Sequence, residues 1–230
     1  MRCAIHQPQF LPWLGHFQKI AMADVFVFLD NVQFQKNEFQ NRNRIPCARA
    51  VQWLTVPVSY AFGDPIRRVR IAERVPWQRK IWGTIEHAYS KAPHFPEYGP
   101  ALRAWLEKEW PGLAEVNMAS VQWLMDCFGI RTPTVPASAL PEGSDDRTGR
   151  LVDICRHLKA ATYVSGSLAQ RYLDVAQFAA AGIEVVFQDY HHPPYPQVHG
   201  QPEFISHMSA IDGLFCVGGG AQGREARNLL

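Results

Sequence analysis

Apolar positions follow two different spacings along the chain. Residues 2–5 and 25–29 are short apolar runs, and the stretch that begins near Leu14 has apolar residues three and four positions apart. This order predicts a strand, a helix and a second strand joined by a right-handed crossover. The same alternation returns later, with strands expected at 132–138, 161–166 and 183–189 and helices at 147–160, 168–182 and 209–218.

The middle of the chain departs from this alternation. Residues 41–45 and 51–58 flank a proline-containing turn and predict a β-hairpin added to the sheet. Segments 77–92, 98–110 and 113–129 have helical spacing and are separated by prolines. We therefore expect one α/β domain over 1–230, with a mainly parallel Rossmann-like sheet, a β-hairpin addition and a helical insertion or cap over 76–130.

Composition narrows the class of protein. The 230 residues are 47% hydrophobic and carry a formal charge of only +2, with the basic residues spread along the chain. A nucleic-acid surface needs clustered basic residues, so no nucleic-acid partner is expected. No apolar run reaches the roughly 20 residues of a membrane span, and the N-terminus lacks the pattern of a secretion signal. The five cysteines have no CxxC spacing, which favours reduced thiols and a cytoplasmic protein.

Hydrogen-bonding residues follow each predicted parallel strand. Ligands of open parallel sheets bind outside the carboxyl ends of the strands, so this edge is the predicted site. Strands must also end somewhere polar, so an ordinary sheet edge is the alternative. The residues at these ends are His6, Gln7, Asp30, Asn31, Gln33, Ser138, Ser165, Gly166, Asp189 and Tyr190.

The densest polar stretch of the chain runs from 29 to 45. Lys36, Arg42 and Arg44 offer charges suited to a phosphate or carboxylate, and arginine adds a planar fork for bidentate contacts. Asn41 and Asn43 offer amides that suit a sugar or a base edge. The alternative is a solvated hairpin, with arginines and asparagines alternating onto its outer face.

Two other segments have a structural interpretation as well as a functional one. Residues 189–200 contain three histidines and Asp189, but no HxH or HExxH spacing, so an ordinary polar loop is expected rather than a metal site. Residues 144–151 open a helix and either bind an anion there or cap it through Asp145, Asp146 or Thr148. The sequence has no GxGxxG, GxxxxGK[ST] or GxSxG motif.

Several motifs resemble the WbqC-like family over nearly the whole chain. They are HQPQFLPWLGHFQKI, ADVFVFLDNVQF, QNRNRI, WLTVPV, GIEVVFQDY and SAIDGLF. Members commonly have tyrosine at the position of His16, and the chain departs from the family after Phe215. The resemblance implies a role near surface-polysaccharide genes, O-antigen especially, and a glycine-transferase activity has been suggested for members. The matching motif positions are His6, Gln7, Pro12, Trp13, Asp30, Gln33, Asn41, Arg42, Asn43, Trp53, Gly166, Asp189, Tyr195, Gln197, Ser209 and Asp212.

A weaker likeness concerns the first strand and helix. Leu14-Gly15-His16 after a proline bend is similar to half of the HxGH signature of nucleotidylyltransferases, with Trp13 in place of the first histidine. Such a bend holds nucleotide phosphates in those enzymes, and it would suit acyl activation through an adenylate. A shared fold does not fix a function.

The leading hypothesis is a transferase of surface-polysaccharide biosynthesis that moves an acyl or aminoacyl group, such as glycyl, to a sugar or related acceptor. Its expected partners are a small sugar or acyl substrate and a donor that is free or carrier-bound, with a nucleotide or nucleotide-sugar as the candidate cofactor. The alternatives are a non-catalytic sugar- or nucleotide-binding assembly protein of the same pathway and a nucleotidylyltransferase.

The predicted site has two sets of residues. The catalytic candidates are His6 as general base or transition-state donor, Asp30, which would orient His6 or an acceptor amine or hydroxyl, and Asp189. The substrate-binding candidates are Gln7, Trp13, Gln33, Lys36, Asn41, Arg42, Asn43, Arg44, Trp53, Gly166, Tyr195 and Gln197. For His6 and Gln7 the competing interpretation is that they satisfy backbone groups in the bend between Pro8 and Pro12.

Overall fold

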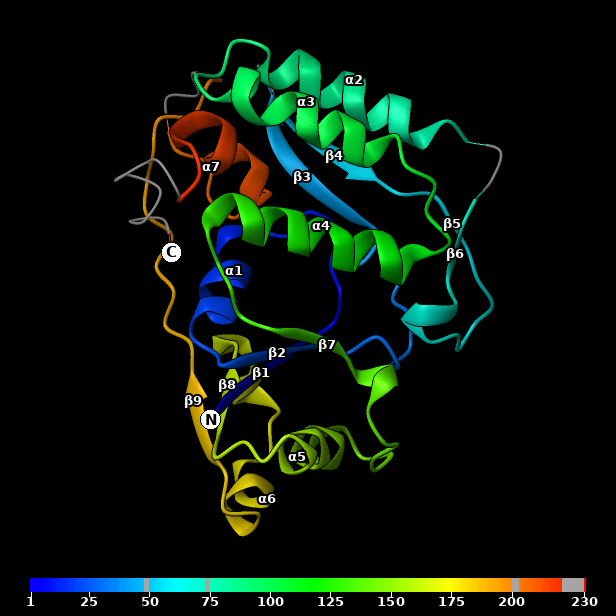
Figure 1. Ribbon diagram of the computed structural model, residues 1–230, viewed down its shortest axis with the longest axis vertical. Coiled ribbons are helices and arrows are strands. Elements are labelled where there is room, and N and C mark those ends of the chain that lie inside the picture. The colour runs from blue at the N-terminus through cyan, green and yellow to red at the C-terminus, as the bar shows by residue number, and fades with distance from the viewer. Residues whose placement is uncertain (48–49, 73–74, 200–202, 221–229) are drawn as a thin grey trace.

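A five-stranded parallel sheet forms the centre of the fold. The computed structural model describes residues 1–47, 50–72, 75–199, 203–220 and 230 (Figure 1). The strand order is β7 (Thr134–Pro136), β2 (Val25–Phe28), β1 (Arg2–His6), β8 (Thr162–Ser165) and β9 (Glu184–Phe187). The predicted α/β class and parallel sheet are confirmed.

Helices cover both faces of this sheet, as the apolar strand sequences require. Residues Ala4, Phe26 and Phe28 belong to the core shared with α1 (Leu14–Ala21). Their neighbours in the strands point the other way and pack against α5 (Arg147–His157) and α6 (Val175–Ala180). Figure 1 shows α5 and α6 on one side of the sheet and α1 on the other.

The predicted hairpin is present as β3 (Arg42–Cys47) and β4 (Ala50–Thr55). It pairs with no strand of the central sheet and forms a two-stranded sheet of its own. Its inner face buries Ile45 and Leu54 in the core that α1 shares. A second small pair, β5 (Val58–Ser59) and β6 (Arg70–Ile71), flanks the 3-10 turn η1 (Ile66–Arg68).

The segment after the hairpin is helical, as the spacing predicts. It contains α2 (Trp77–Tyr89), α3 (Phe95–Leu106) and α4 (Leu113–Phe128), and the last helix of the chain is α7 (Ala210–Val217). Their buried apolar side chains join the core on the α1 side of the sheet. Whether 76–130 counts as an insertion in one domain stays a prediction.

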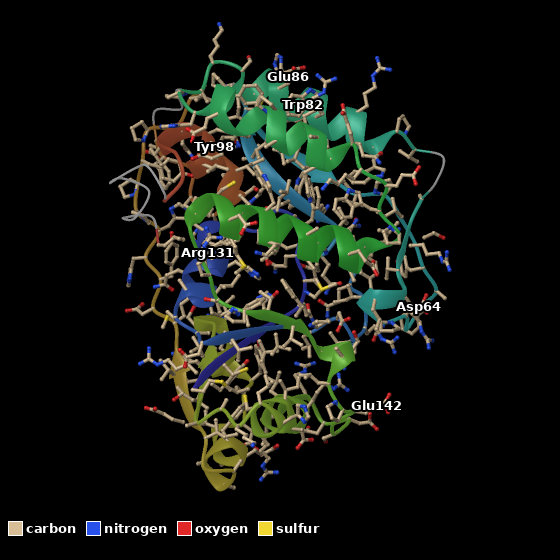
Figure 2. All side chains as sticks on the ribbon, viewed as in Figure 1. Asp64, Trp82, Glu86, Tyr98, Arg131 and Glu142 are labelled. Atoms are coloured by element: carbon tan, nitrogen blue, oxygen red, sulfur yellow. The ribbon has the colours of Figure 1, made fainter. Side chains whose placement is uncertain are left out.

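Charged side chains occupy the periphery of the fold. Glu86, Arg131 and Glu142 are exposed, and Figure 2 shows Glu86 and Glu142 near the edge of the molecule in that view. Within the described ranges, no helix is both long enough and apolar enough to cross a bilayer.

One predicted helix is broken. Instead of a continuous helix over 168–182, the chain forms the 3-10 turn η3 (Ser167–Arg171) and then α6. The break has a local cause, because the Asp174 side chain accepts a hydrogen bond from the Ala176 amide and starts a new helix there. Gly182 has φ +71° and ends the segment in the left-handed conformation, as expected.

Capping also explains the start of α5. The Asp146 carboxylate accepts a hydrogen bond from the Gly149 amide at 2.7 Å. This hydrogen bond favours the capping interpretation of residues 144–151 over an anion site. The edge strand β7 is followed by the 3-10 turn η2 (Ala137–Ala139).

Candidate functional site

A cavity of about 510 Å³ opens at the carboxyl ends of β1 and β8. These strands are neighbours, yet the chain leaves β1 toward β2 on one side and β8 toward β9 on the other. The crevice between them is therefore the topological switch point of the sheet, where open α/β folds bind their ligands. His6, Ser165 and Gly166 line the cavity from these strand ends.

The bend after β1 forms one wall and is fixed by buried side chains. The Asn43 side-chain amide donates to the carbonyls of Phe10 and Leu11, at 3.2 and 2.7 Å. Ser120 accepts from the Leu11 amide at 3.1 Å, and the Ser209 hydroxyl donates to the Leu11 carbonyl at 2.7 Å. These contacts hold Leu11 at φ 42°, a conformation that a non-glycine residue adopts only under such constraint.

Trp13 presents an aromatic wall to the cavity. Its ring stacks on His207, with ring centroids 4.9 Å apart, and meets Tyr190 edge-on at 5.3 Å. Gly15 makes this packing possible, because a Cβ at that position would lie 2.3 Å from the Trp13 ring. The wall suits the apolar face of a sugar or another flat group.

The cavity floor consists of three basic side chains. His6 ends β1, whereas His16 and Lys19 lie three residues apart on α1 and so face the same way. The two imidazoles meet edge-on with ring centroids 4.8 Å apart. The Lys19 ammonium is buried and lies 3.4 Å from the Ile5 carbonyl oxygen. Among the described residues, no carboxylate lines this cavity.

Burial changes the protonation of the floor. It lowers the pKa of Lys19 to about 7. Burial, and then the neighbouring Lys19, lower the pKa of His6 to about 3. The pKa of His16 is held well below its usual 6.5 by burial and by His6 and Lys19. At neutral pH both imidazoles are uncharged, and Lys19 is the group that exchanges a proton.

The hydrogen bonds of the two histidines differ. The Nδ1 atom of His6 lies 2.9 Å from the Gln7 carbonyl oxygen, so it carries the proton and Nε2 is the acceptor. Both ring nitrogens of His16 are buried and have no partner among the described residues. A buried polar group without a partner is destabilising, so His16 is a candidate for contact with a ligand.

The outer face of the hairpin continues the cavity mouth. Arg44 and Phe39 line the cavity, and Arg44 pairs across the hairpin with Trp53. Trp53 is 44% exposed, and the Arg42 guanidinium lies 4.1 Å from its ring centroid. The Nε atoms of both arginines are buried without a partner among the described residues. The mouth thus has planar and cationic groups beside each other.

The structure brings four of the predicted site residues into the cavity lining, namely His6, Trp13, Arg44 and Gly166. Arg42 and Trp53 lie beside its mouth on the hairpin. Gly166 has ordinary extended backbone and open space around its Cα, so it leaves room in the cavity rather than enabling a tight turn.

Other candidates from the strand ends lie outside the cavity lining. Asp30 is buried and accepts hydrogen bonds from the Ser138 amide, at 2.9 Å, and from the Ser138 hydroxyl, linking the ends of β2 and β7. The Asp189 side chain is 89% exposed and pairs with His191 at 3.6 Å. Gln33 makes an isolated bridge with Pro65, and Lys36 is exposed.

The remaining candidates make internal hydrogen bonds. Gln7 accepts from the Gln40 side chain at 2.8 Å, and Asn41 donates to the Val56 carbonyl at 3.2 Å. Tyr195 and Gln197 both donate to Asp212. With Asn43 in the bend, these side chains have their hydrogen bonds made by the protein itself, and a role in binding substrate stays a prediction.

The sequence does not predict Lys19 as a site residue, nor does it predict a role for His16. One signal was available, because both stand on the face of α1 that also carries Ile20, and a lysine on an apolar helix face is unusual. Gln188 is a further unpredicted residue. It lines the cavity and donates to the Gly15 carbonyl at 2.7 Å, which ties the edge of β9 to α1.

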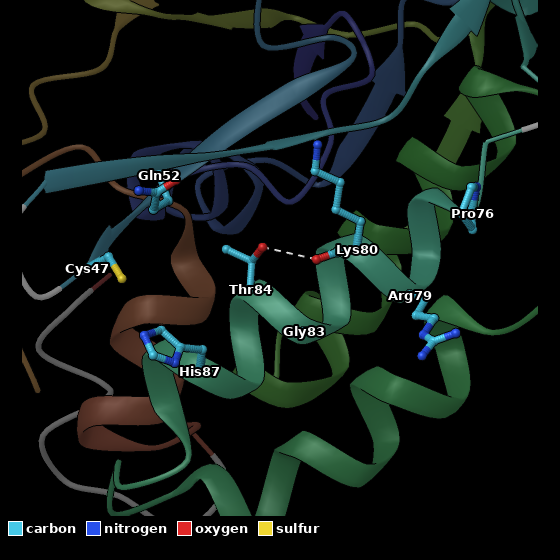
Figure 3. A pocket seen from close by; sticks show the side chains of 8 residues that line it. All are labelled: Cys47, Gln52, Pro76, Arg79, Lys80, Gly83, Thr84 and His87. Atoms are coloured by element: carbon cyan, nitrogen blue, oxygen red, sulfur yellow. Dashed lines mark hydrogen bonds between the residues drawn. The ribbon is translucent and has the colours of Figure 1, made fainter.

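A second hollow lies between β4 and α2. Figure 3 shows its lining, with Lys80 and Arg79 on one helix turn and Thr84 donating to the Lys80 carbonyl at 3.0 Å. This hollow is open, and its charged side chains are solvated. It lacks the buried unpartnered groups that mark the cavity at β1 and β8.

The described residues contain no group of three or more His, Cys, Asp or Glu side chains arranged to hold a metal ion. The loop with the histidines is partly built into the fold, since the His199 Nε2 atom lies 2.6 Å from the Ala88 carbonyl oxygen. Gly200, at the end of that predicted loop, lies outside the described residues.

Comparison with known proteins gives two findings. The model of the WbqC-like protein family matches residues 7–223, so the expectation that the likeness ends at Phe215 is wrong. The chain is also similar to the uncharacterized protein Rv1507c of Mycobacterium tuberculosis (strain ATCC 25618 / H37Rv), with 34% identity over 221 residues, which cover 94% of each chain. No solved structure matches the chain.

Proposed function

The chain belongs to the WbqC-like protein family, and from this premise we propose that it is a transferase that moves an activated acyl or aminoacyl group to a sugar or related acceptor. One observation carries the proposal. Three basic side chains, the half-buried His6 and the buried His16 and Lys19, form the floor of a cavity at the switch point of the sheet, and no carboxylate of the described residues neutralises them.

Lys19 is the best proton acceptor of this floor. A general base works best when its pKa is near the operating pH, and burial brings the pKa of Lys19 to about 7. His6, with a pKa near 3, is too weakly basic to hold a proton at neutral pH. Its Nε2 atom instead accepts a hydrogen bond and orients the attacking group.

The transfer then follows from this arrangement. The hydroxyl or amine of the acceptor forms a bond to the acyl carbon while its proton passes to Nζ of Lys19. The bond between the acyl carbon and the leaving group breaks, and the leaving group, a thiolate or a phosphate, departs with the electron pair. The Lys19 ammonium returns the proton to it, so the enzyme ends the cycle unchanged.

The rest of the cavity suits a sugar-containing substrate. Trp13 supplies a flat wall, and Arg44 at the mouth supplies a fork for a phosphate or carboxylate. A role in surface-polysaccharide synthesis of the O-antigen type is supported by what the family resemblance implies, together with this substrate class.

The experiment is a matrix of donors and acceptors analysed by mass spectrometry. Donors are acetyl-CoA, other short acyl thioesters and glycine with ATP, and acceptors are nucleotide-sugars with free amino or hydroxyl groups. Lys19→Met should lower turnover by about 10²–10⁴-fold, the usual contribution of a general base. Lys91→Met, at an exposed lysine, is the matched control.

A cavity-filling variant tests where the substrate binds. Gly166→Leu fits the local backbone and places its side chain in open space at the cavity. It should fold normally and lose both binding and turnover. Normal turnover in Gly166→Leu would place the reaction elsewhere.

The second candidate is a binding protein of the same pathway. It is favoured by the exposed Trp53 beneath Arg42, because stacking and charge can hold a nucleotide-sugar without chemistry. In that case nucleotide-sugars shift the thermal midpoint, no donor gives product, and Lys19→Met leaves affinity unchanged.

A further inference from the structure

Lys19 and His16 leave hydrogen-bonding capacity unused in a place that water does not freely reach. His16 is 2% exposed and Lys19 3%. Lys19 has three N–H donors when protonated, and among the described residues it donates one hydrogen bond, to the Ile5 carbonyl oxygen. Neither imidazole nitrogen of His16 has a partner among the described residues. Both side chains are part of the cavity lining, so a ligand in the cavity lies beside them.

We propose that this floor is a subsite for an oxygen group with a single negative charge, either a substrate carboxylate or the oxyanion that forms when an acyl carbonyl is attacked. The catalytic half of this inference rests on the proposed transfer, whereas the binding of a carboxylate does not.

The charge of the floor fits one negative charge rather than two. The two imidazoles are neutral, and Lys19 contributes one positive charge when it is protonated. The other titratable groups that line the cavity are Arg44, Tyr163, Tyr172, Tyr190 and His207. Burial raises the pKa of both Tyr163 and Tyr190, so neither adds a charge near neutral pH. The Arg44 guanidinium lies at the mouth, so within the floor a carboxylate is balanced by one ammonium, whereas a phosphate dianion is not.

The helix that carries these residues also favours an anion. Its first turn has no side-chain cap, because Trp13 occupies the N-cap position. The positive end of a helix attracts negative charge. This effect supports the subsite, but the observations that point to a ligand are the two unpartnered nitrogens of His16 and the unused N–H donors of Lys19.

Occupancy of the subsite must take up a proton. An empty floor releases the Lys19 proton readily, and a bound anion favours the ammonium form. The same coupling serves the transfer, since the oxyanion develops as Lys19 receives the acceptor's proton. The floor is thus complementary to the transition state rather than to the neutral substrate.

The test uses N-acetylglycine as the probe and N-acetylglycinamide as its uncharged control. Calorimetry in two buffers of different ionisation enthalpy should show about one proton taken up per N-acetylglycine bound at pH 8, where Lys19 starts deprotonated. Above pH 7 the dissociation constant should rise about tenfold per pH unit, because the protonated fraction of Lys19 falls by that factor. The amide should bind at least tenfold more weakly.

Variants locate the effect. Lys19→Met should remove both the proton uptake and the preference for the carboxylate, and Lys91→Met should keep both. Competitive labelling of individual amines with trace acetic anhydride gives a second measurement. Saturating N-acetylglycine should move the titration midpoint of Lys19 upward and leave that of Lys91 in place.

Several results would overturn the subsite. One is the absence of detectable N-acetylglycine binding, even at 50 times the lowest concentration at which a standard ligand gives a signal. The others are equal binding of the amide and unchanged proton uptake in Lys19→Met. A phosphonate analogue of the tetrahedral intermediate distinguishes the two sources of charge. If it binds more tightly than the carboxylate, and only with an intact Lys19, the oxyanion is the natural occupant.

The experiments distinguish failure of the proposed subsite from failure of the proposed transfer reaction. Carboxylate binding with proton uptake, but no product from any donor, supports the subsite and refutes the transferase. Turnover that depends on Lys19 without any anion preference supports the transferase and refutes the subsite.

Discussion

Two buried ionisable groups in this protein have opposite surroundings. Asp212 on α7 is fully buried and accepts hydrogen bonds from the hydroxyls of Tyr89 and Tyr195, both at 2.7 Å, and from the Gln197 amide at 2.8 Å. Lys19 on α1 is buried almost as completely and has one carbonyl contact at 3.4 Å. The protein itself supplies the hydrogen-bond partners of Asp212, whereas most of the hydrogen-bonding capacity of Lys19 is unused.

The contrast teaches how to separate structural from functional polar residues. Burial raises the pKa of Asp212, but the hydrogen bonds from Tyr195, Tyr89 and Gln197 oppose the rise. For Lys19 burial lowers the pKa and no carboxylate opposes the change. A buried charge with its donors around it joins helices and loops together, whereas a buried base with a single long hydrogen bond and a lowered pKa is a candidate for a functional site.

The largest expected effect on stability comes from removing the Asp212 carboxylate. Asp212→Ala leaves two phenol hydroxyls and an amide without an acceptor in the core, which should lower the free energy of unfolding by about 3–5 kcal/mol. For a domain of this size the thermal midpoint should fall by about 10 °C. Calorimetry measures it, with Asp189→Ala as the control at an exposed aspartate.

A small effect of Asp212→Ala would break the comparison, because the cluster would then not hold α7 in place. Asp189→Ala should stay within about 0.5 kcal/mol of the original protein, as surface substitutions usually do.

The next effect concerns the dependence of stability on pH. The pKa of Lys19 is about 7 in the folded protein and near its ordinary 10.5 in the unfolded chain. Between these values the unfolded chain binds one more proton, so the free energy of unfolding rises with pH by about 1.4 kcal/mol per unit. Lys19→Met should remove this rise, and Lys91→Met should keep it.

Urea unfolding at pH 7, 8 and 9 measures these slopes. The difference between the original protein and Lys19→Met isolates one group, since other titrations are common to both. An equal slope in the two proteins would mean that Lys19 keeps its ordinary pKa, and the floor would then be solvated rather than dry.

The sequence predicts the frame of the molecule better than its site. The alternation of strand-like and helix-like spacing leads directly to the parallel sheet, because both features are local in the chain. The break at Asp174 was missed because the helical spacing continues across it, and only the capping contact with Ala176 decides it. The hairpin was predicted, but its separation from the sheet depends on long-range packing.

The site shows the same limit more sharply. The rule for strand ends points to His6 and Gly166, which do line the cavity. It points equally to Asp30, whose carboxylate is engaged by Ser138, since a sequence does not show which polar groups find partners. Lys19 was missed because it lies within a helix rather than at a strand end, and only the fold brings it beneath β1.

A third prediction tests whether the polar side chains around the bend after β1 stabilise the fold, as those around Asp212 do. Asn43→Ala removes the donor to the carbonyls of Phe10 and Leu11 and should lower stability by about 2 kcal/mol. Trp13 should move with the bend, so tryptophan fluorescence should change as well. Gln52→Ala, at an exposed position of the same hairpin, should change neither. Unchanged stability in Asn43→Ala would show that Ser120 and Ser209 suffice to hold Leu11.

The smallest expected effect is also the most direct comparison of the two regions. His16→Phe replaces an unpartnered imidazole by an apolar ring of similar shape, beside Phe17 and Phe26. Stability should rise by up to about 1 kcal/mol at neutral pH, because two buried polar atoms without partners are removed. Binding of N-acetylglycine should weaken in the same variant, as measured by calorimetry. A gain in stability together with a loss of binding means that the protein retains an unfavourable residue for its ligand. A loss of stability would show instead that His16 is a partnered core residue, and the floor would then resemble the Asp212 cluster.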